Sequence, residues 1–282
     1  GETLTRNRFS LEFGEAITSA YKHGCSFVTV ARGDVSAGEP PVQIQPHSAE
    51  SSAAIWDRRR RQVKYGLTVS EMDGDSPLSL VVYLPDFVLR CERPKGGNWS
   101  VERIENPVGR ALMVPVRYDP QLNSPFGRSR ISNPVMSLTD MGVRAYVRME
   151  GNAEFYSSPQ IALLGVAEDA FGANPDATKW RLAMDRLLAM TKDEDGDVPK
   201  LTQLQQATMQ PHSDMLRTVA MAFSGETSIP PASLGIVHDN PSSAEAIRAQ
   251  ERDLIIEATV QNSLVLSDAV EDIARLSIMV RD

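Results

Sequence analysis

The chain has 282 residues, of which 41% are hydrophobic and 23% are charged. Lys and Arg total 29 against 37 for Asp and Glu, so the formal net charge is −8 at pH 7. This is the composition of a folded protein of about two domains, and its acidity argues against tight, passive binding to nucleic acid. No run of about 18 apolar residues occurs, so no membrane span is predicted. Two cysteines provide neither a disulfide framework nor a zinc site, which favours a reducing compartment.

The two ends of the sequence suggest a piece of a longer protein. The chain begins at Gly1 without an initiator methionine, and it ends at Asp282 inside a segment of helical periodicity. We therefore expect the natural protein to continue at both ends.

The first 120 residues are predicted to form one helix followed by a strand-rich region. Apolar and aromatic residues recur every four positions from Phe9 to Tyr21, with Thr5 or Ser10 as possible caps and Gly24 as the end of the helix. Alternating, β-branched segments separated by turn signals follow, which indicates an antiparallel or mixed sheet with the helix packed on it. The expected strands lie at 25–31, 42–45, 61–69, 78–84, 87–91, 99–104 and 111–116, and the third is expected to place Val63, Tyr65, Leu67 and Val69 on one face.

The second half of the chain is predicted to be mainly helical. A long helix is expected at about 131–157, with Pro134 in its first turn, where proline is tolerated. Residues 166–208 are ambiguous apart from a strand starting at Lys200. A helix resumes at Pro211, with Ser213 or Asp214 near its cap and Gly225 at its end. The final helix starts at a capping-box pair, Ser242 and Glu245, and its expected apolar face consists of Ile247, Leu254, Ala258, Leu264, Val270, Ile273 and Leu276.

Motifs for catalysis or metal binding are not found in the sequence. The four histidines lie far apart, and the consecutive His212-Ser-Asp letters do not make a triad, which brings distant residues together. The acidic turn that begins at Asp193 fails the EF-hand pattern, because glycine stands at the fourth position and Leu204 at the twelfth. No glycine-rich nucleotide loop and no G-x-S-x-G motif occurs. We therefore predict no catalytic residue, metal or cofactor, and an enzyme is disfavoured.

One dense basic run, Arg58–Arg61, interrupts this acidic chain. If the run forms part of a strand, alternate side chains point to opposite faces, so only two arginines share a side. The nearby carboxylates of Glu50, Asp57 and Glu71 are possible ion-pair partners. A solvated or subunit-facing strand is therefore preferred over a nucleic-acid contact.

Three stretches, taken in order, resemble the portal proteins of tailed bacteriophages. The first is Val114-Pro-Val-Arg-Tyr-Asp-Pro followed by Phe126-Gly-Arg-Ser-Arg-Ile-Ser, which is similar to the family's entry into its first long stem helix. The second continues that helix from Asp140 and ends in Pro-Gln-Ile-Ala-Leu-Leu-Gly. The third starts at Ser228-Ile-Pro-Pro and is similar to a signature that joins two helices, although Ser243 stands where the family often has glycine. The resemblance covers the chain from about residue 9 onward.

The resemblance implies an α+β portal-protein fold with an α/β wing, long stem helices, a small α/β clip and a C-terminal helix. The implied parts are the wing at 1–120, the first stem helix at 121–165, the clip at 166–208, the second stem helix at 209–225, the tunnel loop at 226–242 and, at 243–282, a long helix leading toward a crown that lies beyond the sequence.

The resemblance also implies a structural role in the virion. The subunits would form a ring, typically of twelve, at one vertex of the capsid, after assembly in the host cytoplasm. The implied partners are other copies of the chain, terminase, the head–tail adaptor, capsid and scaffold proteins, and duplex DNA passing through the channel without sequence specificity. A net charge of −8 per subunit would repel phosphate and keep that channel free of tight contacts.

Candidate site residues also follow from the resemblance. The tunnel loop would face DNA, but it has no Lys or Arg before Arg248, so we expect no gripping of phosphate there; the alternative is an ordinary interhelical loop. The clip would bind neighbouring subunits and terminase. The tunnel-loop candidates are Ser228, Ser233, His238, Asp239 and Asn240, and the clip candidates are Lys179, Trp180, Arg186, Lys192, Asp193, Glu194, Asp197 and Lys200.

Two other classes of protein stay open. Another virion protein or head–tail adaptor would share the acidity and the oligomerisation but would not form a ring with a DNA-wide channel. A metal-dependent nucleic-acid enzyme would need clustered carboxylates, and the only such cluster is Asp193, Asp195 and Asp197.

Overall fold

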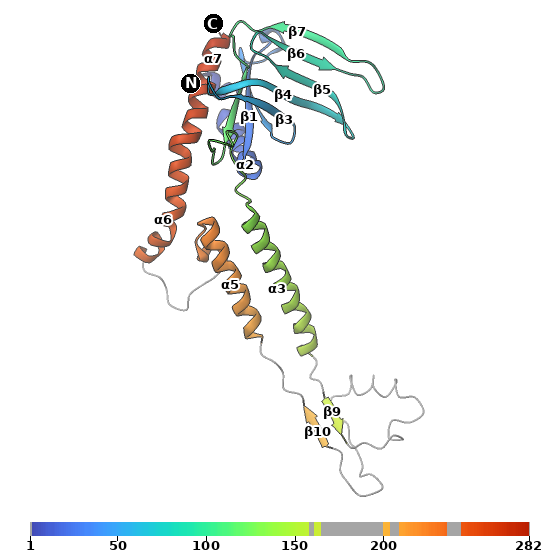
Figure 1. Ribbon diagram of the computed structural model, residues 1–282, viewed down its shortest axis with the longest axis vertical. Coiled ribbons are helices and arrows are strands. Elements are labelled where there is room, and N and C mark those ends of the chain that lie inside the picture. Colours follow the sequence, from blue (N-terminus) through green and yellow to red (C-terminus); the bar gives the residue numbers. More distant parts are fainter. Residues whose placement is uncertain (1, 158–160, 165–199, 204–208, 236–243, 282) are drawn as a thin grey trace. The chain divides into compact units, whose positions relative to one another are not determined.

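The computed structural model describes residues 2–157, 161–164, 200–203, 209–235 and 244–281 (Figure 1). It divides into two compact units. The first consists of residues 1–136, 226–233 and 237–282, and the second of residues 137–225 and 234–236. Helices and antiparallel sheets together confirm the α+β class expected from the sequence. None of the described helices is both long and apolar enough to cross a bilayer.

The core of the first unit forms around a three-stranded antiparallel sheet with the order β2-β1-β8. The consecutive residues Ser26–Val30 of the central strand are all buried, so both faces of that strand are covered. Helices α2 and α7 both pack against this sheet, and the Ser26 hydroxyl donates to the Ala16 carbonyl of α2 at 2.7 Å. The elements are α1 Glu2–Arg6, α2 Phe9–His23, β1 Cys25–Arg32, the short 3-10 helix η1 Val35–Ala37, β2 Val42–Ser48 and β8 Met113–Arg117.

The ends of α2 are set by backbone conformation. Gly24 ends the helix with a φ of 96°, as the sequence predicts, and a Cβ there would lie 3.0 Å from the Arg128 carbonyl carbon. The caps expected at Thr5 or Ser10 are wrong. The residue before the helix is Arg8, which has a left-handed φ of 47° and makes no side-chain capping bond.

A second sheet follows in the chain as an antiparallel meander of five strands (Figure 1). Its strands pair in sequence order, as expected for short strands separated by tight turns. They are β3 Ser52–Asp57, β4 Gln62–Asp73, β5 Ser76–Tyr83, β6 Phe87–Glu92 and β7 Ser100–Glu105.

The buried face of β4 differs from the prediction. Val63 is buried as expected, but Gly66 and Thr68 are buried beyond it, whereas Tyr65, Leu67 and Val69 are not fully buried. The cause is a register shift against β3, which leaves one extra residue, Lys64, between two paired positions and turns the following residues to the other face. A Cβ on Gly66 would lie 2.6 Å from the Met113 Sδ, so this face of β4 comes close to β8.

Two helices and a two-stranded ribbon belong largely to the second unit. They are α3 Asn133–Ser157, β9 Ile161–Leu164, β10 Lys200–Gln203 and α5 Gln210–Thr227, and β9 pairs with β10 antiparallel. A Cβ on Gly142 of α3 would lie 3.7 Å from Val219 of α5, and Asn152 Nδ2 lies 2.6 Å from His212 Nε2. The two helices therefore lie side by side. The predicted ends of α5 are wrong by a few residues, because Ser213 and Asp214 lie inside its first turns and Gly225 lies before its end.

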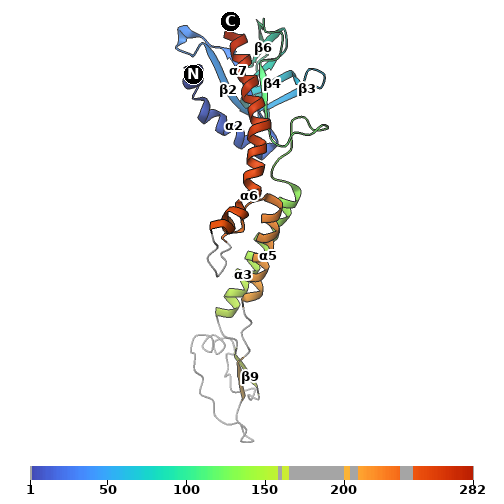
Figure 2. The ribbon, with the colours of Figure 1, turned by 90° about the vertical axis from the view of Figure 1, so that its left-hand side faces the viewer.

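The C-terminal segment is continuously helical, as α6 Ala244–Val260, the π-helical turn η4 Gln261–Leu266 and α7 Ser267–Arg281 (Figure 2). The wider π turn changes which residues face inward. Leu266 is therefore buried, whereas Leu264 of the predicted apolar face is 69% exposed. Ile273 and Leu276 are buried as expected. A further 3-10 turn, η3 Pro231–Leu234, precedes this segment.

We predict that His47 makes stability fall as the pH drops below neutral. Burial lowers the pKa of His47, whose Nε2 lies 2.9 Å from the Thr29 hydroxyl. The unfolded chain therefore takes up a proton near pH 6.5 that the folded chain refuses, so the His47 contribution is complete above that pH and is lost below it. A His47→Gln variant should lose less stability than the parent between pH 7 and pH 5 in urea unfolding. Parallel curves for the two proteins would contradict this prediction.

Candidate functional site

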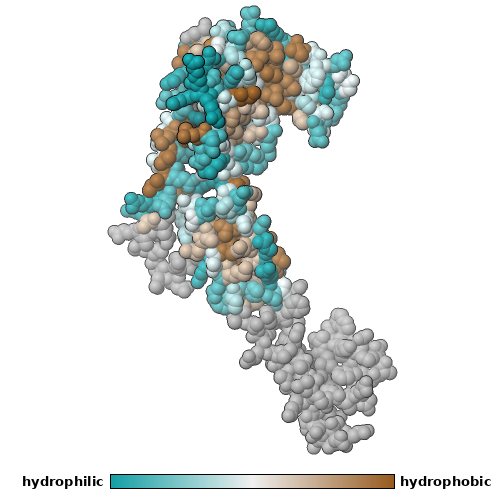
Figure 3. Space-filling view, in the orientation of Figure 1, coloured by the Kyte–Doolittle hydropathy of each residue, from teal (hydrophilic) through white to brown (hydrophobic). Residues whose placement is uncertain are grey.

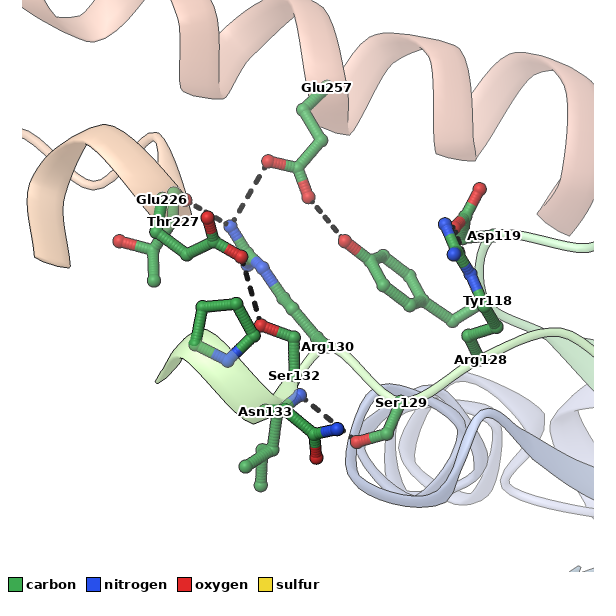
Figure 4. A pocket seen from close by; sticks show the side chains of 12 residues that line it. Tyr118, Asp119, Arg128, Ser129, Arg130, Ser132, Asn133, Glu226, Thr227 and Glu257 are labelled. Atoms are coloured by element: carbon green, nitrogen blue, oxygen red, sulfur yellow. Dashed lines mark hydrogen bonds and ion pairs between the residues drawn. The ribbon is translucent and has the colours of Figure 1, made fainter. Parts of the chain in front are cut away.

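A polar pocket of about 640 Å³ lies where three segments of the first unit meet (Figure 4). The loop between β8 and α3 forms one wall, the end of α5 a second, and α6 the third. Its lining is Tyr118, Asp119, Arg128–Pro134, Glu226, Thr227 and Glu257.

The carboxylate of Glu257 is the central hydrogen-bond acceptor of this pocket (Figure 4). Its Oε1 accepts from the Tyr118 hydroxyl at 2.5 Å, and its Oε2 accepts from Arg130 Nη2 at 3.2 Å. The same Arg130 nitrogen donates to the Thr227 carbonyl at 3.0 Å. Burial, together with the hydrogen bond to Glu257, raises the pKa of Tyr118 far above its ordinary value, so the phenol stays protonated and remains a donor. One carboxylate and one guanidinium thus connect three distant segments.

The loop that carries Arg130 is fixed to the end of α2 by backbone contacts. Arg130 N–H donates to the Tyr21 carbonyl at 2.9 Å, and the Ser129 hydroxyl donates to the Lys22 carbonyl at 2.6 Å. Gly127 has a φ of 87°, and a Cβ there would lie 2.1 Å from the Tyr118 carbonyl oxygen. Only glycine fits this position. The loop therefore presents Arg130 from a rigid base.

Two further contacts join the lining of the pocket. The Ser132 hydroxyl donates to Glu226 Oε1 at 3.0 Å, which connects the start of α3 to the end of α5. Arg128 and Asp119 form an ion pair at 2.6 Å, but both side chains are largely exposed, so the pair stabilises the fold by at most about 1 kcal/mol.

The C-terminal helix makes further polar contacts beyond the pocket. Gln261 Nε2 donates to the Arg117 carbonyl at 2.6 Å, and Arg117 pairs with Asp268 at 2.9 Å. Arg110 binds both carboxylate oxygens of Asp272 at 2.7 Å, and its side chain is 15% exposed. Such a bidentate pair fixes distance and angle together. Polar contacts therefore recur between Glu257 and Asp272 along the line where this helix meets the chain around β8.

The polar groups at the centre of this arrangement are bonded to one another. Glu257, Tyr118 and Arg130 satisfy one another, and the raised pKa makes the phenol a poor proton source near neutral pH. Within the described residues, no group of three or more His, Cys, Asp and Glu side chains is placed to hold a metal ion.

Of the candidate residues predicted from the sequence, the three that the structure describes, Ser228, Ser233 and Lys200, do not line this pocket. Ser228 follows α5 with a φ of 57°, and Ser233 of η3 donates its N–H to the carbonyl of Pro230, the residue before η3. Lys200 begins β10. The other candidates lie outside the described residues: His238, Asp239, Asn240, Lys179, Trp180, Arg186, Lys192, Asp193, Glu194 and Asp197. The assignments to tunnel loop and clip therefore stay predictions.

The sequence did not single out Tyr118, Arg130 and Glu257. Tyr118 and Arg130 both stand in the first stretch that resembles portal proteins, which is the one signal that pointed to this region. Glu257 lies 127 residues beyond Arg130 in the chain, and nothing in its local sequence marks it.

We predict that Glu257→Gln destabilises the first unit by about 1–3 kcal/mol, since it leaves Arg130 in a partly buried site without its charged acceptor. Arg128→Gln, which removes the exposed pair with Asp119, should cost no more than about 1 kcal/mol. Urea unfolding of both variants measures the difference. In a double-mutant cycle, Tyr118→Phe and Glu257→Gln should show a coupling above about 0.5 kcal/mol. Equal, small losses of stability in Glu257→Gln and Arg128→Gln would refute a central role for Glu257.

Comparison with known proteins gives the chain its relatives. No family model matches the sequence. The chain is 28% identical over 281 residues to the portal protein of Mycobacterium phage D29, and 26% identical over 279 residues to the portal protein of Mycobacterium phage L5. Each alignment covers 96% of this chain and 56% of the relative, so the chain spans about half the length of the curated relatives it matches.

A similar solved structure is a chain from the neck of an empty GTA particle, with 12% identity and a TM-score of 0.39 over 94% of this chain and 65% of that one. That likeness is too weak to bear on the fold. The two sequence alignments extend over nearly the whole chain and confirm the resemblance drawn from its motifs. The chain is related to the phage portal proteins.

Proposed function

We propose that this chain is the structural subunit of a ring-shaped phage portal, placed at a capsid vertex and serving as the conduit for DNA during packaging and ejection. The observation that carries the proposal is the similarity to two phage portal proteins over 96% of the chain. The proposed partners are other copies of the chain, terminase, the head–tail adaptor, and capsid and scaffold proteins. The subunit would be assembled in the host cytoplasm and would remain in the virion.

The proposed parts of the subunit follow the order of elements in the chain. Residues 1–120 would be the wing, 121–165 and 209–225 the two stem segments, and 166–208 the clip. Residues 226–242 would form the tunnel loop, and 243–282 would lead toward a crown. The long helices α3 and α5 support this order, since each falls almost wholly within a segment that the resemblance assigns to the stem.

Exposed apolar helix surfaces support assembly into a ring. In α3, Val143, Tyr146 and Val147 are each about 60% exposed. In the C-terminal helix, Ile256, Val260 and Leu264 recur every four residues and are 50%, 51% and 69% exposed. Figure 3 shows hydrophobic side chains on the outer surface of this helix. A closed ring built head to tail needs two different patches on each subunit, and these two faces meet that requirement.

The junction at Glu257 suits such a subunit. A conduit holds its shape against the force of DNA translocation, and a bond network that joins three segments resists their separation. The net charge of −8 fits the same role, because it limits tight binding of the DNA that passes through.

Negative-stain electron microscopy tests the proposed ring directly. We expect annular particles, with a central hole wide enough for duplex DNA, from the purified chain or from the longest natural gene product that contains it. Persistent monomers or dimers of both proteins would sink the proposal. They would favour another virion or adaptor protein, and metal-dependent cleavage of DNA by the same samples would favour an enzyme.

We predict that Val143→Glu with Val147→Glu shifts the assembly toward monomers, since it places two charges on a surface that a neighbour would bury. The control, Ser137→Glu with Arg144→Gln, makes the same change in net charge at exposed polar positions of α3 and should assemble like the parent. Analytical ultracentrifugation of the two variants and the parent reads the outcome. Loss of assembly in both variants would point to net charge, and loss in neither would exclude this face from the contact.

A further inference from the structure

The basic run Arg58–Arg61 forms the turn between β3 and β4, not part of a strand as the sequence predicted. The reason is Asp57, whose Oδ1 accepts from the backbone N–H groups of Arg59 and Arg60 at 2.9 and 3.1 Å and so closes the turn. All four arginines are exposed. The restriction to two on one side, which a strand would impose, therefore does not apply.

Among the described residues, none of the carboxylates expected to pair with these arginines forms an ion pair with them, although the backbone N–H of Arg60 and the charges of Arg60 and Lys64 help to lower the pKa of the nearby Asp57. Glu50 lies 3.7 Å from both Lys22 and His23, and the Asp57 carboxylate accepts from the backbone of the turn. Among the described residues, no ion pair of Arg58–Arg61 occurs. Several other exposed cations of the first unit do face a carboxylate, although Arg8 and Arg103 do not within the described part of the chain: Arg6 faces Glu2, Lys22 faces Glu50, Lys95 faces Asp73 and Arg275 faces Glu271.

Arg61 gives a second indication that the charge itself matters. Its φ of 53° is left-handed, a conformation that glycine or asparagine adopts at lower cost. A side chain with a Cβ is strained at this φ, whereas glycine is not. The turn therefore carries a fourth cation where a neutral residue would suit the backbone better.

The surroundings of the turn add to its positive charge. Lys64, the extra residue in β4, is exposed, and its Nζ lies 4.9 Å from the centre of the Tyr65 ring. Residues 57–64 thus contain five cations and one carboxylate in a chain whose net charge is −8. The described residues of this segment offer no row of exposed aromatic rings on which unpaired bases would stack.

We propose that the β3–β4 turn is a contact site for the phosphate backbone of duplex DNA, without sequence specificity. A duplex carries one phosphate charge per about 1.7 Å of its axis, so a compact group of guanidinium groups engages several phosphates together. An acidic protein surface would also attract the turn, but four adjacent exposed arginines, none in an ion pair among the described residues, suit a repeating line of phosphate charges better than a packed protein interface. The inference goes beyond the proposed ring and does not depend on it.

Fluorescence anisotropy with a labelled duplex of about 20 base pairs tests the proposal, with the parent chain in the oligomeric state in which it is purified. The test variant is Arg58→Ser, Arg59→Ser, Arg60→Ser and Arg61→Gly, which keeps Asp57 and gives the turn residues that favour turns. The control variant, Arg6→Gln, Lys22→Gln, Lys95→Gln and Arg275→Gln, removes four charges from exposed cations that already face carboxylates. Both variants reach the same net charge.

We expect the parent to bind with an affinity that falls about 100-fold between 50 and 200 mM salt, as four phosphate contacts imply. The turn variant should bind at least about tenfold more weakly at low salt, with a log–log salt slope less negative by about 3–4, while the control variant stays within about threefold of the parent. Thermal unfolding should show the turn variant to be as stable as the parent or more so.

Three results would overturn the proposal. They are no binding of duplex by the parent at 50 mM salt, equal losses in the two variants, and unchanged binding by the turn variant. Electron microscopy of the same samples separates this outcome from that of the proposed function, because the turn variant should still form whatever rings the parent forms.

Discussion

The hydrogen bonds of the Glu257 carboxylate are the contacts on which the arrangement of segments in the first unit most depends. It accepts from Tyr118 and from Arg130, which is itself bonded to the last carbonyl of α5, so residues far apart in the chain meet at one group. Its side chain is only 32% exposed, so the ion pair is partly desolvated. A pair of this kind contributes modestly when complete but is costly to leave half made. Its value therefore lies in specifying one arrangement of three segments more than in net stability.

The continuous C-terminal helix makes further polar contacts with the rest of the first unit, beyond Glu257 along its length. Gln261 reaches a backbone carbonyl of β8, and Asp272 binds Arg110 through both oxygens. The π turn between α6 and α7 is consistent with this role, because a regular helix would present different residues to the sheet. The π turn thus allows one helix to contribute Glu257 to the polar pocket and, farther along, Ile273 to the apolar core.

Local order was predictable from this sequence, and long-range order was not. The spacing of apolar residues located α2, α3 and most strands, because each depends on neighbours a few residues away. The buried face of β4 and the exposure of Leu264 were missed, since one extra residue in a strand or one wider helical turn reverses the face without a strong signal in composition. The strand expected at Arg58–Arg61 was wrong because the capping ability of Asp57 outweighed the alternation pattern. The Glu257 junction joins residues more than 120 positions apart, which periodicity does not detect.

The chain is acidic overall but has a cationic turn, so the force on a nearby DNA molecule depends on which of these charges lies within the screening distance. At about 0.1 M salt the Debye length is about 10 Å, so exposed charges farther away are largely screened. A duplex close to the β3–β4 turn would therefore respond mainly to the arginines there and only weakly to acidic residues on distant elements. In the proposed ring, the net charge of −8 on each subunit would act on the enclosed DNA from all sides, so the repulsion from many subunits would add. Net acidity and a local basic contact are thus compatible. The arginines would act on DNA close to the β3–β4 turn, and the net negative charge would act on DNA inside the proposed ring.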